Sequence, residues 1–209
     1  MRRYSGEMVL PPDDFSEKLD RPTVFLAGAI DMGEAEDWQA KLAKALEDVD
    51  CTILNPRRLD WDKTWKQEMS FGPFREQVEW ELSGLDAVDV VAVGLPAGSK
   101  APISLMELGL HARNGSAVVW CPEGYWRKGN VDIVCARYGV PVFEDFDEFA
   151  AEVVERLRVV RIASRVAGKK MLDLMKSIRK PMPPPTSKHE RKDKPSRKKE
   201  KDKLRQHWG

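Results

Sequence analysis

Short runs of β-branched and aliphatic residues alternate along this chain with longer segments whose apolar residues recur at helical spacing. Five such runs are predicted to be strands: residues 23–29, 52–54, 89–94, 117–121 and 140–143. Strands that are apolar on both faces are typical of a parallel sheet covered by helices on both sides. The pattern therefore predicts an α/β fold with a doubly wound parallel sheet of five strands.

Right-handed crossovers between successive strands favour the flavodoxin-like order 2-1-3-4-5. Ligands of such sheets bind at the carboxyl ends of the strands, where the strand order reverses. That point lies between the first and third predicted strands. Gly28 and Asp31 would meet the 95–107 segment there, which makes this edge the predicted site.

The remaining segments divide the chain into four parts. Residues 1–21 are polar and rich in turn formers, and we expect an irregular arm there, followed by the α/β domain over residues 22–160. A helical extension over residues 161–180, interrupted at Gly168, leads into a tail at 181–209 that opens with Pro-Met-Pro-Pro-Pro-Thr. The tail is dominated by Lys and Arg, and we expect it to be disordered because it cannot bury enough apolar surface.

The formal net charge of +1 hides a strong division of charge. From Lys176 onward there are 13 Lys/Arg against 4 Asp/Glu, a net charge of +9. The other residues contain 22 basic against 30 acidic side chains, a net charge of −8. An acidic body is unsuited to binding nucleic acid. The basic tail is therefore either a solubilising extension or a segment that binds nucleic acid or another polyanion.

Several classes of protein are disfavoured by the sequence. No apolar run approaches the roughly 20 residues of a membrane span, and no signal-peptide pattern follows the first methionine. Cys51, Cys121 and Cys135 form no paired motif, which favours a reduced, cytoplasmic protein. The three histidines are scattered, so we expect no metal site.

Two segments near the predicted site carry unusual side chains. Glu107 is the one acid between residues 95 and 112, among apolar neighbours, so it is either a half-exposed helix residue or a carboxylate with a chemical role. The loop at 60–74 contains Trp61, Trp65 and Phe71, which either plug the sheet edge or contact a flat base. In the helix predicted to follow it, at 74–87, the apolar residues Val78, Leu82 and Leu85 are expected to face inward.

Three segments together resemble the nucleoside 2-deoxyribosyltransferase family and its relatives, the deoxynucleoside-monophosphate N-glycosidases. They are Met106-Glu107-Leu108-Gly109 with Ala112, the strand at 24–30, and the segment at 85–91. The similarity covers about residues 22–155.

The resemblance implies a nucleophile, an acid and an oligomer. In that family a glutamate at the position of Glu107 attacks C1′ of the sugar, which requires no cofactor. Glu81 matches an acid of the family's site, the alternative being an exposed helix glutamate. Asn130 matches an asparagine that reaches the site of a neighbouring subunit, which implies a homo-oligomer. The alternative is that Asn130 caps its own helix.

Some positions depart from the family pattern. Phe25 stands where some members have a tyrosine that orients the nucleophile, and Ala101 stands where transferases often have an aspartate that contacts the base. The nucleotide-hydrolysing relatives hold a 5′-phosphate with arginines after the first strand, but Asp31 and Glu34 lie here and would repel it. A nucleoside is therefore the expected substrate, with Phe25, Gly28, Asp31 and Asn130 as expected substrate-binding residues.

Three functions follow from these observations. The first is transfer or cleavage of the N-glycosidic bond of (deoxy)nucleosides by double displacement through Glu107. The second is hydrolysis of another N-glycoside, such as a nicotinamide dinucleotide. The third is a non-catalytic binding module whose tail binds a polyanion.

Overall fold

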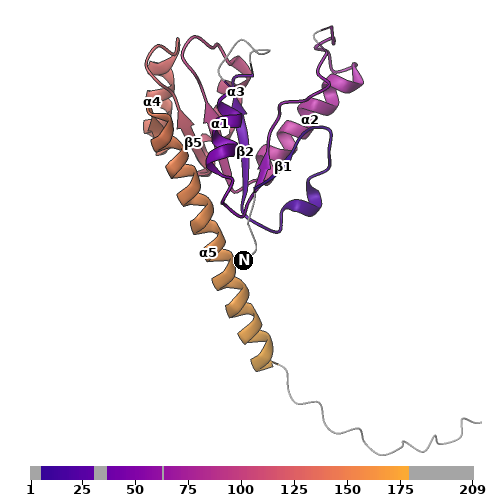
Figure 1. Ribbon diagram of the computed structural model, residues 1–209, viewed down its shortest axis with the longest axis vertical. Coiled ribbons are helices and arrows are strands. Elements are labelled where there is room, and N and C mark those ends of the chain that lie inside the picture. Colours follow the sequence, from indigo (N-terminus) through magenta and orange to yellow (C-terminus); the bar gives the residue numbers. More distant parts are fainter. Residues whose placement is uncertain (1–5, 31–36, 63, 179–209) are drawn as a thin grey trace, which may run out of the picture. The chain divides into compact units, whose positions relative to one another are not determined.

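The computed structural model describes residues 6–30, 37–62 and 64–178, with side chains described as far as Met171. Its single sheet has six strands, all parallel, in the order β1-β3-β2-β4-β5-β6. The strands are β1 (Glu7–Val9), β2 (Thr23–Gly28), β3 (Thr52–Leu54), β4 (Val90–Gly94), β5 (Ala117–Trp120) and β6 (Val142–Phe143). The α-helices are α1 (Trp38–Ala45), α2 (Gly72–Ala87), α3 (Pro102–His111), α4 (Lys128–Tyr138) and α5 (Phe146–Ile178) (Figure 1).

The predicted α/β class and the relative order of the five predicted strands are confirmed. The sixth strand, β1, lies in the arm that we expected to be irregular, and it pairs with β3 at the sheet edge, with Glu7 opposite Thr52. Two further bonds hold it, from the amide of Glu7 to the carbonyl of Cys51 and from the amide of Asn55 to the carbonyl of Val9, each 3.0 Å long. Three residues with one acid among them carry too weak a pattern to be recognised as a strand.

The strands divide their side chains between two core clusters, one on each face of the sheet. On one face, Phe25 and Val93 pack with residues of α2, α3 and α4. On the other, Leu26 and Ala92 pack with residues of α1 and α5. Each face is thus covered by helices, which explains why the strands are apolar on both sides.

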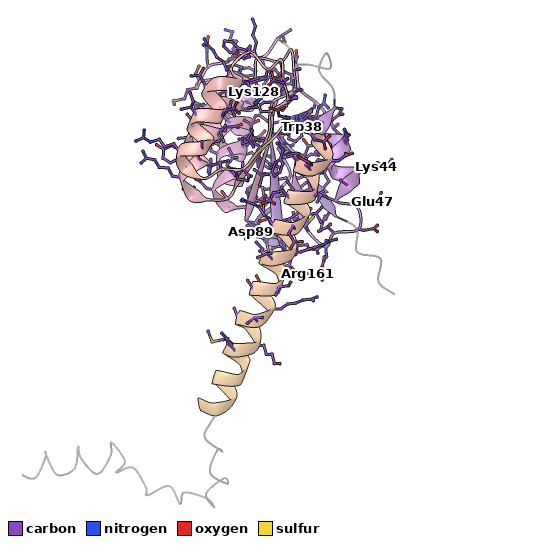
Figure 2. The ribbon with its side chains drawn as sticks, turned by 90° about the vertical axis from the view of Figure 1, so that its left-hand side faces the viewer. Trp38, Lys44, Glu47, Asp89, Lys128 and Arg161 are labelled. Carbon is purple, nitrogen blue, oxygen red and sulfur yellow. The ribbon has the colours of Figure 1, made fainter. Side chains whose placement is uncertain are left out.

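Trp38 fixes α1 against the centre of the sheet (Figure 2). Its indole nitrogen donates to the carbonyl of Ala29 at 3.1 Å, and its ring lies against Gly28 and Gly94, which are opposite one another in β2 and β4. A Cβ at Gly28 would lie 2.3 Å from the carbonyl oxygen of Gly94 and 2.6 Å from the Trp38 ring, and φ there is 151°. Gly28 is therefore required by packing within the sheet.

The inner face of α2 differs from our prediction. Gln77, Trp80, Gly84 and Leu85 are buried, whereas Leu82 is 41% exposed and Val78 is only partly buried. At Gly84, α2 lies very close to β2, because a Cβ there would be 2.9 Å from the Phe25 ring. The Trp80 ring packs on Phe25 as well, with centroids 6.0 Å apart. These two contacts fix the rotation of the helix about its axis.

The C-terminal helix is longer than predicted. The α5 helix is continuous through Gly168, so the predicted interruption there is wrong. Asp145 caps its start, because the Asp145 carboxylate accepts hydrogen bonds from the amides of Asp147 and Glu148, at 2.8 and 3.0 Å. The chain divides into two units between Ala167 and Gly168. The predicted tail at 181–209 lies outside the described residues.

The state of the cysteines and the apolarity of the helices are two further features of the structure. Cys51, Cys121 and Cys135 are free and buried. Within the ranges that the structure describes, no helix is both long enough and apolar enough to cross a membrane.

Candidate active site

Glu107 lies in the second turn of α3, on the face of the helix that points into the protein. It is 6% exposed, and Ser104, Leu108 and His111 share its buried face. Ile103, Met106 and Leu110 project outward instead and are each more than half exposed. The alternative of a half-exposed surface glutamate is therefore wrong, and α3 presents an acid inward and aliphatic side chains outward.

Burial changes the acidity of this carboxyl group. The pKa of Glu107 is raised from 4.5 to about 7, first because burial penalises the charged form and second because of the negative charge of Glu81. A carboxyl group with a pKa near neutral pH can exchange its proton during a reaction. This is the electrostatic environment expected of a catalytic carboxylate.

Glu81 comes from α2 and is only partly exposed, so the alternative of an exposed helix glutamate is also wrong. Burial raises its pKa, and a hydrogen bond donated by Gln77 opposes that rise. The structure thus places the two predicted acids, which are 26 positions apart in the sequence, within electrostatic range of one another. When two carboxyl groups interact, the pair titrates as a unit.

Gln77 is a residue of this region that our sequence analysis missed. It is buried one helical turn before Glu81, and its amide nitrogen donates to Glu81 Oε1 at 2.8 Å and to the carbonyl of Pro56 at 2.9 Å. The available signal was the spacing of Gln77, Trp80, Glu81 and Gly84, which places these residues on one face of a helix. Val78 and Leu82 obscured that signal, because aliphatic residues are normally assigned to the buried face.

The loop before α3 is held in a strained conformation. Ala101 has φ 42° and ψ 52°, a left-handed geometry that costs a residue with a Cβ about 1 kcal/mol. Tyr125 Oη and Trp126 Nε1 both donate to the carbonyl of the preceding Lys100, at 2.9 and 3.0 Å. These two bonds offset the strain and fix the point from which α3, and with it Glu107, begins.

The other predicted substrate-binding residues are distributed differently. Phe25 and Gly28 are fully buried, Phe25 beneath α2 and Gly28 beneath Trp38, and Asp31 lies outside the described residues. Asn130 is exposed in the first turn of α4. That helix begins at Lys128 with no side-chain cap, so the alternative in which Asn130 caps it is wrong.

The aromatic residues of the 60–74 loop form a stack of their own. Ring centroids are 5.1 Å apart for Trp61 and Trp65 and 6.1 Å apart for Trp65 and Phe71, and the Arg58 guanidinium lies 5.1 Å from the Trp65 centroid. Arg58 is itself paired with Glu76 of α2 at 2.9 Å. These rings belong to neither core cluster. The alternative in which they contact a base stays a prediction.

A charged cleft lies at the other end of the strands. It has a volume of about 280 Å³, and its lining includes Asp50, Asp89 and Arg161. Asp50 and Arg161 pair at 2.6 Å, and Asp89 accepts bonds from the amide and hydroxyl of Thr23, each 2.9 Å long. Figure 2 shows Asp89 and Arg161 at the opposite end of the body from Lys128. Asp50, Asp89 and Arg161 thus already have partners within the protein, and the lining of the cleft includes neither Glu81 nor Glu107.

No metal site is found among residues 6–30, 37–62 and 64–178. Nowhere in these ranges do three or more His, Cys, Asp or Glu side chains form a group that could hold an ion. The acids described at this site are Glu81 and Glu107, and together they can supply a carboxylate and a proton.

Comparisons with known proteins give one family match. A family model described as "Nucleoside 2-deoxyribosyltransferase like" matches residues 21–125, half of the chain, a range that includes Glu81 and Glu107 but not Asn130. No curated protein sequence matches. Among solved structures, a conserved protein from Enterococcus faecalis V583 aligns with a TM-score of 0.49 and 12% identity, over 65% of this chain and 99% of that chain.

Proposed function

We propose, since this chain belongs to the nucleoside 2-deoxyribosyltransferase-like family, that it transfers or cleaves the N-glycosidic bond of (deoxy)nucleosides. The family supports a function related to glycosyl transfer. The observation that carries the proposal for this chain is the buried Glu107, whose pKa is raised to about 7 beside a second acid. Such a pair supplies the two groups that double displacement at an anomeric carbon requires.

The proposed reaction has two steps. In the first, a carboxylate oxygen of Glu107 attacks C1′, the C1′–N bond breaks, and the departing base keeps the electron pair and accepts a proton. Glu81 in its protonated form is the proposed source of that proton. In the second, the nitrogen of another base, or a water molecule, attacks C1′ and releases Glu107, while Glu81 takes back a proton.

The productive form of the pair therefore carries one proton. A single proton shared by two interacting carboxyl groups is favoured over a wide pH range, because the first charge opposes the formation of the second. A carboxyl group whose pKa is raised is a stronger base when it is ionised. When it is protonated, it still holds a proton that it can donate near neutral pH. Burial raises the pKa of both carboxyl groups, which supports a proton held by the pair near neutral pH, and the proposed roles require that proton to lie on Glu81 when the base departs.

We also propose that the working unit is a homo-oligomer in which Asn130 serves the site of a neighbouring subunit. Asn130 is exposed, as that role requires. The outward face of α3 carries Ile103, Met106 and Leu110, and α4 exposes Ile133. Apolar residues exposed on adjoining elements favour burial in an interface.

Product analysis tests the function and separates transfer from hydrolysis. The protein is incubated with a panel of deoxynucleosides, with and without free acceptor bases, and the products are separated by chromatography. Transfer yields new nucleosides only when an acceptor is present, and hydrolysis yields free sugar without one. A 2-fluoro sugar analogue should leave a mass adduct on the peptide that contains Glu107. Release of base from a nicotinamide dinucleotide, with all deoxynucleosides unchanged, would contradict the proposed substrate.

A further inference from the structure

The Gln77 side chain is a buried polar group on a helix face that packs against the sheet. It is 3% exposed, and its neighbours on that face include Trp80 and Leu85. Buried glutamines are uncommon, and their amide groups need partners because an unpaired polar group is penalised inside a protein. What this amide contacts therefore indicates what it does.

Both partners of the Gln77 amide nitrogen are acceptors. One is the carbonyl oxygen of Pro56, in the loop after β3, which lies 2.9 Å from Gln77 Nε2. The other is Glu81 Oε1, one turn further along α2, which lies 2.8 Å from the same nitrogen. The amide can face two acceptors only with its NH₂ group, so its orientation is determined by its surroundings. Gln77 Oε1, also buried, has no hydrogen-bond partner among the described residues.

This arrangement uses both N–H bonds of the amide, one on the backbone of a neighbouring loop and one on an acid. A glutamine that only joined α2 to the loop after β3 would need the bond to Pro56 alone. The second bond restrains the Glu81 carboxyl group, which would otherwise rotate freely about its side-chain torsions. The same glutamine thus ties the acid to the carboxyl edge of the sheet.

We infer that Gln77 is a positioning residue, which clamps the Glu81 carboxyl group beside Glu107 and ties it to the loop after β3. This inference rests on the proposed function, in which Glu81 handles the proton of the departing base. Gln77 acts through Glu81 and does not itself touch the substrate.

The clamp has an electrostatic consequence that can be measured. Burial raises the pKa of Glu81, and the Gln77 amide on its own helix opposes that rise. Glu81 in turn raises the pKa of Glu107 on α3, while Arg58 is occupied by Asp60 and Glu76. The donated N–H stabilises the charged form of Glu81 and lowers its pKa against the effect of burial. Removing it should raise the pKa of Glu81. The pKa of Glu107 should then fall, because Glu81 carries less negative charge at any given pH.

Gln77→Met tests this inference, because methionine has a similar length and volume but no N–H. The carboxyl groups of ¹³C-labelled glutamates are titrated by NMR in the full-length protein without substrate, and assigned with Glu81→Gln and Glu107→Gln. We expect the Glu81 midpoint to rise by at least about 0.5 pH units and the Glu107 midpoint to fall. Glu79→Gln, an exposed position on the same helix, should leave both midpoints unchanged. An unchanged Glu81 midpoint in folded Gln77→Met would overturn the inference.

Kinetics provide a second readout that a purely structural role would not change. In Gln77→Met, we expect kcat to fall about tenfold with a small change in KM, and the alkaline limb of the pH–rate profile to move to higher pH. In a Glu81→Gln background, the same substitution should have almost no further effect on kcat. An equal loss in both backgrounds would show that Gln77 does not act through Glu81.

The experiments also allow for a variant that does not fold and for a protein that turns over no nucleoside. If Gln77→Met does not fold, Gln77→Asn keeps the amide but is too short to span both acceptors, and it should raise the Glu81 midpoint as well. If the wild-type protein turns over no nucleoside, the proposed function fails. The titrations then still decide whether Gln77 clamps Glu81, because they need no substrate.

Discussion

The Glu81 carboxylate on α2 lies close enough to Glu107 on α3 for its negative charge to raise the pKa of the Glu107 carboxyl group. Neither residue has a basic partner among the described ion pairs, whereas Glu76 and Glu79 on the same helix are paired with Arg58 and Arg75. Two exposed acids of α2 are thus paired with arginines, whereas Glu81, which acts on Glu107, has no such partner among the described ion pairs. Acids kept in this way are typical of sites that transfer protons.

Replacing Glu107 should abolish turnover and leave the fold intact. Glu107→Gln keeps the size of the side chain but removes the nucleophile, so we expect the rate to fall by at least about a thousandfold. Chromatographic assays would measure this, with circular dichroism to verify folding. Glu79→Gln serves as the matched control and should keep its activity, because Glu79 is exposed. Near wild-type rates in Glu107→Gln would exclude it as the nucleophile.

The stability of the protein should depend on pH through Glu107. In the unfolded chain this carboxyl group loses its proton near pH 4.5, but in the folded protein only at about pH 7. Between these values the folded state binds more protons, so the free energy of unfolding should fall by on the order of 3 kcal/mol as pH rises, and then level off. Urea unfolding at several pH values should show this fall in the wild type and not in Glu107→Gln. Parallel curves would contradict the raised pKa.

Mixing two inactive variants should restore activity if sites are shared between subunits. Glu107→Ala and Asn130→Ala should each be nearly inactive alone. Random exchange between dimers makes half of them mixed, each with one intact site of two, so about a quarter of the wild-type activity should return. No recovery after verified subunit exchange would place Asn130 in its own subunit's site or outside the chemistry.

Removing the basic tail should leave the body unchanged. Truncation after residue 180 deletes the proline-rich segment and most of the basic charges, which have little apolar surface with which to pack. Melting temperature and nucleoside turnover should therefore stay close to those of the full chain. A fall of several degrees would show that the tail is structural. Weaker binding of DNA or RNA at low salt, measured in parallel, would support a polyanion-binding role.

Gly28→Ala should destabilise the protein by about 3 kcal/mol. The added Cβ would overlap the backbone of Gly94 and the Trp38 ring, at a φ that disfavours any side chain. Gly109→Ala is the matched control, since no atom lies within 4 Å of a Cβ there, and it should change stability by less than about 1 kcal/mol. Equal effects in urea unfolding would show that the contact between Gly28 and Trp38 is not tight.

Much of the fold was determined by the sequence alone. The apolar runs predicted five of the six strands and their parallel type, and the spacing between them required crossover helices, so the relative order of these five was predicted correctly. The same logic placed the loop before α3 at the reversal of the strand order. The segment with Glu107 could be recognised because its residues are adjacent in the chain.

Only the tertiary structure decided which side chains of α2 face the interior of the protein. Whether Val78 or Gln77 faces inward depends on the rotation of α2 about its axis, and that rotation is set by the contact of Gly84 and Trp80 with Phe25. A count of apolar positions cannot contain this information, because a small residue that permits close approach contributes nothing to the count. The same rotation leaves Glu81 partly buried, where its charge raises the pKa of Glu107. The sequence thus supplied the two acids, and packing between α2 and β2 made them a pair.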